Sequence, residues 1–379
     1  MRPEDFVVGP MTRGQLLRRT AAMGLGVSSL GLLSACGSDS TAPASSASTG
    51  GAAAAGPPSA ADVTGTIVLL NYPGWIAPTT IPGFQSKYPG TKVKQTAAGF
   101  ESLSGVAQSV AQNPTAYDVM LASNDICAQL EAGGFVLKVD EKTVPNLASN
   151  DERIRQIYPW GIATDSATIG IGYRKDLVKE PVQTWDDFWQ LVPRYSGKVV
   201  MNGVDRDVIG NTLIYLGKDG NSTNPDDLAA AKDALVKIKP HVRAFKVTNI
   251  AQSLLNGTAA LTMGYNYETA AAAEKNPNIV FVAPEEGVMG YVEGFIGISK
   301  TDNVPTVEAF LNYAGEPKAL GAMANTIIAN GTSRAAKPFM DKGLRGPEFD
   351  LAENATLLKF LGADGVKLWN ETWSEIQAA

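Results

Sequence analysis

Residues 66–71 read TIVLLN and residues 117–122 read YDVMLA, and these two short apolar runs decide the fold. Continuous apolar runs of this length are typical of strands buried on both faces of a sheet. Residues 102–112, which lie between them, have the pattern of a helix. Strands that alternate with helices form βαβ units, so the sequence predicts a parallel sheet covered by helices.

The same alternation continues toward the C-terminus. Gly133-Gly134 is the expected stop of one helix, while Thr184 and Asn224 are the expected N-caps of two others. We predict further strands at residues 91–95, 168–174, 198–202, 258–264 and 279–282. Further helices are predicted at residues 126–132, 185–192, 208–216, 225–239, 306–313 and 357–376.

The composition argues against nucleic-acid binding, and the length of the chain is sufficient for two lobes. The chain has 379 residues, enough for two lobes, with 44% hydrophobic and 18% charged residues. Its net charge of −6 leaves no basic footprint for nucleic acid. Residues 1–36 carry four arginines and two acids, so the remainder has a net charge near −8, which favours cationic solutes.

The N-terminus predicts an exported lipoprotein. Arginines at positions 13, 18 and 19 precede an uncharged run over residues 21–35 that is too short to span a bilayer, as in a signal peptide. Leu33-Ser34-Ala35-Cys36 matches the lipobox of bacterial lipoproteins. We therefore expect a signal peptide over residues 1–36 and a lipid on Cys36 that anchors the chain to the outer face of the cytoplasmic membrane. The alternative is an ordinary secretory signal with an incidental cysteine.

The export route and the start residue stay open, and the segment after Cys36 is predicted to be a tether. Gly14 interrupts a motif of the twin-arginine type, so the sequence fits both export routes, and Met11 is an alternative start to Met1. Residues 37–63 consist almost wholly of Ser, Ala, Gly, Thr and Pro. Such a composition cannot bury apolar area, so we expect a flexible tether.

Cysteine and histidine are too scarce for the common catalytic and metal sites. Acylation of Cys36 would leave Cys127 without a disulfide partner, and its apolar surroundings predict a buried small hydrophobe. His241 is the only histidine and is expected at the surface or at a helix end. No zinc pattern, nucleophile elbow, Walker loop or calcium loop is present. We therefore expect no enzyme, no metal and no cofactor.

Aromatic residues in short polar loops are the most informative positions. Several of them directly follow predicted strands or stand beside acids, namely Tyr72, Trp75, Tyr265, Tyr267 and Tyr291 next to Glu293. Loops at the carboxyl ends of parallel strands form the ligand crevice of open α/β sheets. Aromatic faces attract alkylammonium groups, and carboxylates can hold their charged ends. The alternative is that these rings only cover the edges of the sheet.

From about Thr66 onward, the chain resembles the spermidine/putrescine-binding proteins of bacterial ABC importers. The shared stretches follow one another in order and include Tyr117-Asp118-Val119, Ile169-Gly170-Ile171-Gly172-Tyr173, Thr184-Trp185-Asp186-Asp187-Phe188, Arg206-Asp207-Val208-Ile209-Gly210 and Pro284-Glu285-Glu286-Gly287. The resemblance implies a periplasmic-binding-protein-like fold of type II, with two α/β lobes joined by two crossing strands and a ligand cleft between them. It places the crossings near residues 166–172 and 289–295, lobe 1 at 64–168 plus 294–338, and lobe 2 at 169–293 plus 339–379.

The resemblance also implies a set of ligand-binding residues: Tyr72, Trp75, Ser123, Asp125, Asp205, Asp207, Tyr265, Tyr291 and Glu293. Several positions depart from the family pattern. Tyrosines replace tryptophans at 72, 265 and 291, Glu293 replaces an Asp, and Asp207 replaces a Glu. Val204 replaces an Asp for which the neighbouring Asp205 could substitute, and Asp125 replaces a Tyr. Ala329 stands where another Tyr is expected, and Leu361 where a Gln is.

The function implied by the resemblance is that of a solute-binding lipoprotein outside the cytoplasmic membrane. It would deliver a small organic cation such as putrescine or spermidine to the membrane subunits of an ABC permease by hinge closure, as a monomer. The altered site residues leave other ligands open, including an amino acid, a zwitterion or a metal complex. A surface lipoprotein without a transport role, or an enzyme on the same lobes, is the remaining alternative.

Overall fold

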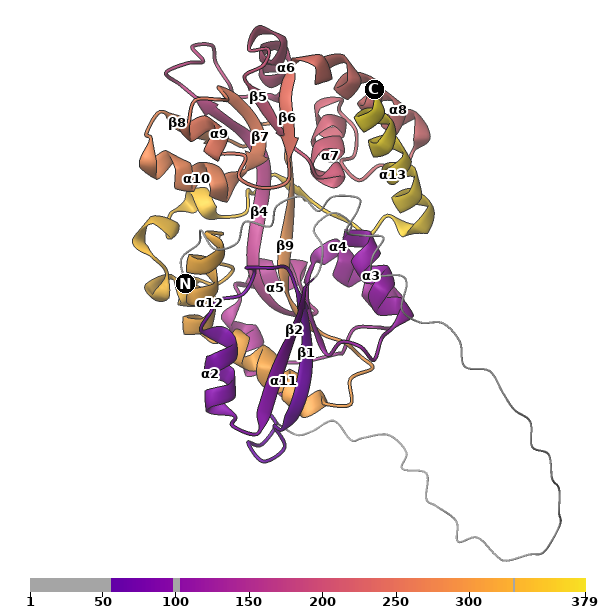
Figure 1. Cartoon of the computed structure of the whole chain (residues 1–379), viewed down its shortest axis with the longest axis vertical. Helices are drawn as coiled ribbons and strands as arrows, with labels where there is room; N and C mark the ends of the chain where they lie inside the picture. Colours follow the sequence, from indigo (N-terminus) through magenta and orange to yellow (C-terminus); the bar gives the residue numbers. More distant parts are fainter. Residues whose placement is uncertain (1–55, 98–102, 330) are drawn as a thin grey trace, which may run out of the picture. The chain divides into compact units, whose positions relative to one another are not determined.

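A ten-stranded mixed sheet is the frame of the described residues, with the strand order β2-β1-β3-β9-β4-β7-β5-β6, β10 beside β9, and β8 beside β4 (Figure 1). The computed structural model describes residues 56–97, 103–329 and 331–379, all in one unit of the chain. The predicted signal peptide, the lipidation site Cys36 and most of the predicted tether lie outside these residues.

Two sets of parallel strands form the two ends of the sheet. At one end β1 pairs in parallel with β2 and β3, and at the other β5 pairs in parallel with β6 and β7. TIVLLN forms most of β1, where Ile67 and Leu69 are fully buried. The bounds are Gly65–Asn71 for β1, Thr91–Ala97 for β2, Val119–Ser123 for β3, Val199–Asn202 for β5, Val242–Lys246 for β6 and Leu261–Tyr265 for β7.

The centre of the sheet is antiparallel, so the parallel sheet predicted from the βαβ alternation does not extend to it. Two long strands, β4 (Gly161–Arg174) and β9 (Val288–Gly297), pair antiparallel with each other; β9 also pairs antiparallel with β3, and β4 with β7 and β8. Strand direction depends on where the chain crosses the molecule, and local hydrophobic patterns carry no record of this. The short strands β8 (Ile279–Val282) and β10 (Ala355–Leu357) complete the sheet.

Close contact between the two central strands depends on a glycine. A Cβ atom on Gly294 of β9 would lie 2.2 Å from the backbone oxygen of Ile162 on β4. Any other residue would therefore push the two strands apart. Next to this contact the register shifts between Ala163 and Asp165 of β4, and Asp165 lies opposite Glu293 of β9.

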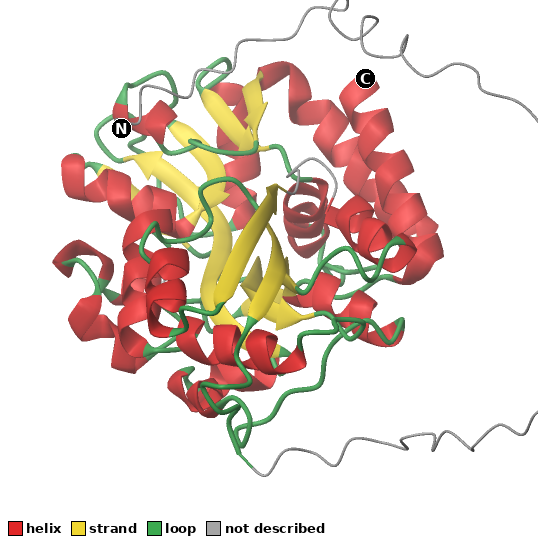
Figure 2. Cartoon of the chain, turned by 60° about the horizontal axis from the view of Figure 1, so that its bottom comes forward, coloured by secondary structure: helices red, strands yellow, loops and turns green. Residues whose placement is uncertain are grey.

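Helices surround the sheet (Figure 2). Their bounds are Thr80–Lys87 (α2), Leu103–Gln112 (α3), Asn124–Ala132 (α4), Glu152–Ile157 (α5), Trp185–Arg194 (α6), Asp205–Tyr215 (α7), Pro225–Ile238 (α8), Gln252–Leu255 (α9), Asn266–Lys275 (α10), Val304–Ala314 (α11), Pro317–Ile327 (α12) and Gly362–Ala378 (α13). The predicted N-cap Thr184 is confirmed, because its side chain accepts a hydrogen bond from the Asp187 amide in a capping box. None of the described helices is long and apolar enough to cross a bilayer.

Four predicted boundaries are wrong by three residues or more, and one of them is the helix predicted at 208–216, which begins at Asp205. The strand predicted at 168–174 begins at Gly161, and the strand predicted at 258–264 begins only at Leu261. The helix predicted at 357–376 begins at Gly362, where a φ of 72° turns the backbone. Its first predicted residue instead ends strand β10, and residues 358–361 form a loop. That loop matters because it reaches the site described below.

Candidate ligand-binding site

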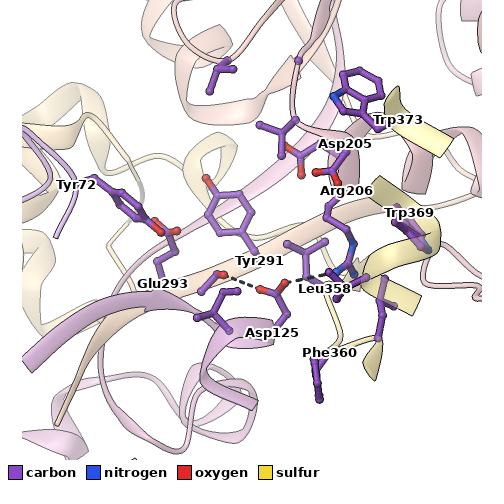
Figure 3. Close-up of a pocket in the computed structure, with 18 of the residues that line it drawn as sticks. Tyr72, Asp125, Asp205, Arg206, Tyr291, Glu293, Leu358, Phe360, Trp369 and Trp373 are labelled. Atoms are coloured by element: carbon purple, nitrogen blue, oxygen red, sulfur yellow. Dashed lines mark hydrogen bonds and ion pairs between the residues drawn. The ribbon is translucent and has the colours of Figure 1, made fainter. Parts of the chain in front are cut away.

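A cavity of about 210 Å³ lies where segments from both ends of the sheet meet. All nine predicted ligand-binding residues line it: Tyr72, Trp75, Ser123, Asp125, Asp205, Asp207, Tyr265, Tyr291 and Glu293 (Figure 3). Most of them follow the carboxyl ends of β1, β3, β5 and β7, which is where an open α/β sheet forms its ligand crevice. The structure thus brings together residues that are up to 221 positions apart in the sequence, from Tyr72 to Glu293.

Glu293 is the buried carboxylate at one side of the cavity. Its residue is 7% exposed, and Asp165, directly opposite on β4, is 1% exposed. Burial raises the pKa of Glu293 well above its ordinary value, and repulsion from Asp165, Asp125 and Asp207 raises it further. Burial also raises the pKa of Asp165 to about 7, although hydrogen bonds from Thr164 and Trp75 oppose this effect.

Asp207 and Asp205 stand in the first turn of helix α7. The Asp207 Oδ2 atom accepts hydrogen bonds from the Tyr265 hydroxyl at 2.9 Å and from the Asn202 amide at 3.0 Å. Burial nevertheless raises the pKa of Asp207 to about 7. Burial likewise raises the pKa of Asp205. The positive end of the helix dipole favours the charged form of both acids, but burial outweighs it.

Aromatic rings make up much of the wall. The Tyr265 and Tyr267 rings are stacked, with centroids 5.3 Å apart and planes at 11°, and the Tyr291 ring lies edge-on to Tyr265 at 6.3 Å. Helix α13 adds Trp369 and Trp373, which the sequence analysis did not single out. Their spacing of four residues was visible in the sequence, but that spacing is also typical of side chains that only pack against a core.

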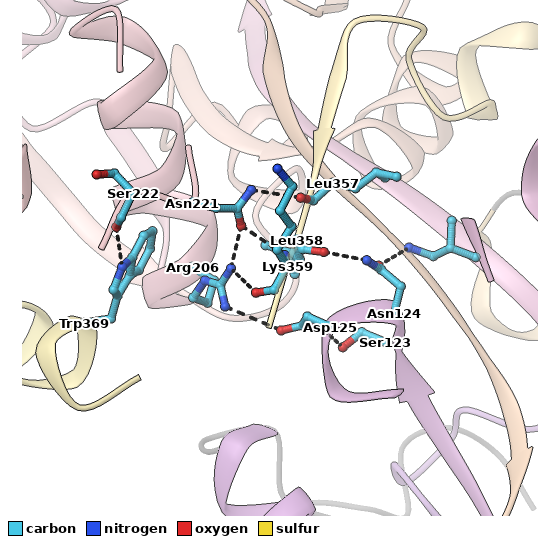
Figure 4. Close-up of polar contacts among 11 residues, drawn as sticks. Ser123, Asn124, Asp125, Arg206, Asn221, Ser222, Leu357, Leu358, Lys359 and Trp369 are labelled. Carbon is cyan, nitrogen blue, oxygen red and sulfur yellow. Dashed lines mark hydrogen bonds and ion pairs between the residues drawn. The ribbon is translucent and has the colours of Figure 1, made fainter. Parts of the chain in front are cut away.

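Arg206 is the most important lining residue that the sequence analysis missed as a site residue. Its Nη1 atom lies 3.5 Å from Asp125 Oδ2, and its guanidinium carbon lies 4.8 Å from the centre of the Trp369 ring. Its Nη2 atom donates hydrogen bonds to Asn221 Oδ1 at 2.8 Å and to the Lys359 backbone oxygen at 3.1 Å (Figure 4). Among the lining residues that the structure describes, Arg206 is the only cation.

The other residues considered in the sequence analysis differ in whether they line the cavity. Leu361, where the family pattern has Gln, lines the cavity, whereas Ala329 is fully buried and is not part of the lining. Cys127 is fully buried, as predicted, with its sulfur 3.2 Å from the Tyr158 hydroxyl. His241 is outside the cavity and contacts Ser196. No group of three or more potential metal ligands occurs within the described part of the chain.

The site can therefore hold a positively charged organic group. Four acids face one cation, and an acid buried in this way is stabilised when a cation pairs with it. The aromatic faces add a surface that attracts ammonium groups and alkyl chains.

Comparisons with known proteins agree with this fold. Residues 79–338 match the family model described as bacterial extracellular solute-binding protein. The putrescine-binding periplasmic protein PotF of Escherichia coli is 24% identical over 349 residues, covering 83% of this chain and 91% of that protein. The putrescine/agmatine-binding protein of Pseudomonas aeruginosa is 26% identical over 346 residues, covering 82% and 92%.

Two solved structures share the fold. The Tp0655 (TpPotD) lipoprotein of Treponema pallidum superposes with a TM-score of 0.71 at 22% identity, covering 82% of this chain and 99% of that one. The spermidine/putrescine ABC transporter substrate-binding protein PotD of Streptococcus pneumoniae gives a TM-score of 0.68 at 19% identity, covering 83% and 99%. The predicted periplasmic-binding-protein-like α/β fold is thus confirmed. With the family model matched over most of its length, the chain belongs to the bacterial extracellular solute-binding protein family.

Proposed function

We propose that this protein captures a small organic cation of the putrescine or spermidine type outside the cytoplasmic membrane and delivers it to an ABC import permease. The observation that carries this proposal is the excess of carboxylates in the cavity, where the buried Glu293, Asp207 and Asp125 and the half-buried Asp205 face a single guanidinium. The names of the relatives, which include putrescine-binding and spermidine/putrescine-binding proteins, point to the same ligand class.

The electrostatics of the cavity favour an amine over other ligands. The pKa values of Glu293 and Asp207 are raised because their charges are buried without enough compensation, and a ligand ammonium would supply it. A ligand carboxylate would meet the same acids, and the one guanidinium is already engaged by Asp125. An amino acid, a zwitterion and a metal complex are therefore less well suited to this cavity.

The central strands support a hinge between two lobes. Strand β4 pairs with β9 from Gly161 to Ile169 and with β7 from Ile169 to Tyr173, so it leaves one end of the sheet and enters the other. We propose that β4 and β9 are the two crossings, with lobe 1 at 64–168 plus 294–338 and lobe 2 at 169–293 plus 339–379. Each lobe then contributes part of the lining, and closing the lobes would enclose the ligand.

A thermal-shift screen of the chain from residue 37 onward tests the ligand class. Because a ligand stabilises only the folded state that binds it, a diamine at a hundred times its dissociation constant should stabilise the protein by about 2.7 kcal/mol. We expect stabilisation by putrescine or related amines and none by amino acids. If amino acids stabilise the protein and amines do not, the proposed ligand class is wrong.

We further propose that the protein is a lipid-anchored monomer. The signal peptide would occupy residues 1–36, the lipid would be attached to Cys36, and residues 37–63 would form the tether to the outer face of the cytoplasmic membrane. The lipobox Leu33-Ser34-Ala35-Cys36 supports this arrangement.

Replacing the proposed lipidation site should release the protein from the membrane. In cells that express Cys36→Ala, we expect the protein in the soluble extracytoplasmic fraction, because without its thiol no acyl chain can be attached. The matched control Cys127→Ala, which changes the buried cysteine, should remain with the membranes. Equal fractionation of Cys36→Ala and the unaltered protein would contradict the anchor.

A further inference from the structure

Strand β4 contains a β-bulge beside Glu293. The register sets Ala163 opposite Gly294 and Asp165 opposite Glu293. Two steps along β4 thus match one step along β9, and Thr164 is the extra residue. Residues directly opposite each other in an antiparallel pair project from the same face of the sheet, with Cβ atoms about 5 Å apart. The bulge therefore places the carboxyl group of Asp165 beside that of Glu293.

The two carboxyl groups also share neighbours. The Thr164 hydroxyl donates a hydrogen bond to Asp165 Oδ1 at 2.8 Å and lies 3.4 Å from the Glu293 backbone oxygen. Burial raises the pKa values of both acids, and a hydrogen bond from the Trp75 indole lowers each of them in part. Glu293 lines the cavity, whereas Asp165 does not, so a ligand meets Glu293 first and Asp165 lies behind it.

No cation compensates this pair. Among the described residues, no lysine, arginine or histidine forms an ion pair with Asp165 or Glu293. The titratable groups that face the pair from the neighbouring elements are acids or neutral side chains: Tyr72 after β1, Asp125 and Cys127 on α4, Tyr158 before β4, Asp207 on α7, Tyr267 on α10 and Tyr291 on β9. Burial raises the pKa values of these tyrosines and of Cys127, so they stay neutral.

Two adjacent negative charges in such surroundings repel each other strongly. Like charges directly opposite on neighbouring strands are destabilising, and buried carboxyl groups in contact titrate as a pair rather than singly. The pair is therefore most stable in the ligand-free protein when it keeps one proton and one negative charge.

We propose that Asp165 is a positioning residue that acts through Glu293: the two carboxyl groups share one proton in the ligand-free protein and release it when a ligand ammonium binds. The inference rests on the proposed function, since it concerns the same cavity. The ammonium binds beside Glu293, one carboxyl O–H bond breaks, and its proton passes to water. The ligand keeps all its protons, and the pair changes from one negative charge to two.

This coupling favours strongly basic ligands. The second negative charge forms only when a positive charge close by compensates it, because charges interact strongly in a buried site. A neutral ligand supplies no such charge, and the carboxylate of a zwitterion opposes it. Asp165 thus adds attraction for an ammonium group without leaving two uncompensated charges in the empty protein.

Counting protons tests the coupling. Putrescine adjusted to pH 7 is added to weakly buffered protein at pH 7, and the alkali needed to hold the pH gives the number of protons released. We expect the unaltered protein to release at least about half a proton more per bound ligand than Asp165→Asn, because the asparagine variant has no carboxyl pair. Between pH 6 and pH 8, linkage then requires the affinity of the unaltered protein to rise about tenfold more than that of the variant. A purely structural role of Asp165 would weaken binding equally at every pH and leave the proton count unchanged.

Two further variants keep the test decisive. Asp165→Ser also removes the carboxyl group, with a smaller side chain, and should lose the same fraction of a proton. Glu308→Gln is the matched control, because Glu308 is a buried carboxyl group on α11, 9% exposed, that does not line the cavity, and its removal should leave the proton count unchanged. Any proton that Asp207 releases is common to all of these proteins and cancels in the comparison.

The possible results separate the two proposals. Putrescine binding without proton release by the unaltered protein, or equal release by the unaltered protein and the folded Asp165 variants, would overturn the inference. Absence of binding to any amine would instead overturn the proposed function.

Discussion

Glu293→Gln is expected to weaken putrescine binding by at least about a hundredfold, or about 2.7 kcal/mol, because it removes a buried charge without changing the size of the side chain. Glu293 projects into the cavity from β9, and no cation among the described residues forms an ion pair with it. Titration calorimetry at pH 8, where the cavity acids are ionised most fully, would measure the loss.

Glu286→Gln is the matched control. Glu286 is exposed, and its Oε1 atom accepts a hydrogen bond from the Trp185 amide at 2.9 Å, which a glutamine can also accept. We expect putrescine binding within about threefold of the unaltered protein, since the substitution is distant from the cavity acids and loses no hydrogen bond. Equal losses in the two variants would mean that the ligand binds elsewhere.

The ligand-free protein is expected to become less stable as the pH rises from about 4 to above 7. Burial raises the pKa values of Asp165 and Asp207 to about 7 and that of Glu293 well above its ordinary value. In this range the unfolded chain, with ordinary carboxyl pKa values near about 4, has released protons that the folded chain still holds. Raising the pH therefore favours unfolding. One such carboxyl group corresponds to about 4 kcal/mol, so a fall of at least about 2 kcal/mol in the free energy of unfolding is a conservative expectation.

Urea unfolding between pH 5 and pH 8, with and without putrescine, measures this effect. A bound diamine should flatten the pH dependence, because its ammonium groups lower the pKa values of the same acids. Glu293→Gln should flatten it in the absence of ligand. A ligand-free protein that gains stability steadily from pH 5 to pH 8 would contradict the expectation.

The sequence predicted the parallel parts of the fold well because their signals are local. TIVLLN is apolar on both faces, and a strand of that kind needs a helix on each side to cover it. Thr184 followed three positions later by Asp187 marks a helix start for an equally local reason. The antiparallel pairing at the centre of the sheet was not predicted, because the direction of β4 depends on its distant partner β9.

The same difference between local signals and contacts of distant segments explains which site residues were predicted and which were missed. Tyr72 and Glu293 were predicted from the resemblance, and the structure places both in the cavity. Asp165 was missed because its importance comes from the register of β4 and β9, which sets it opposite Glu293. Arg206 was missed as a site residue because an arginine at the start of a helix usually faces solvent, and only its partners from distant segments bury it here.

The order in which the cavity acquires its walls has a consequence for synthesis. Its lining begins at Tyr72 near the start of the described chain and ends at Trp373 on helix α13. A ribosome adds residues from the N-terminus, so a nascent chain lacks the Trp369 and Trp373 wall until α13 has been made. The complete lining of the cavity, and with it the proposed capacity to retain a ligand, therefore arises only when elongation has passed α13.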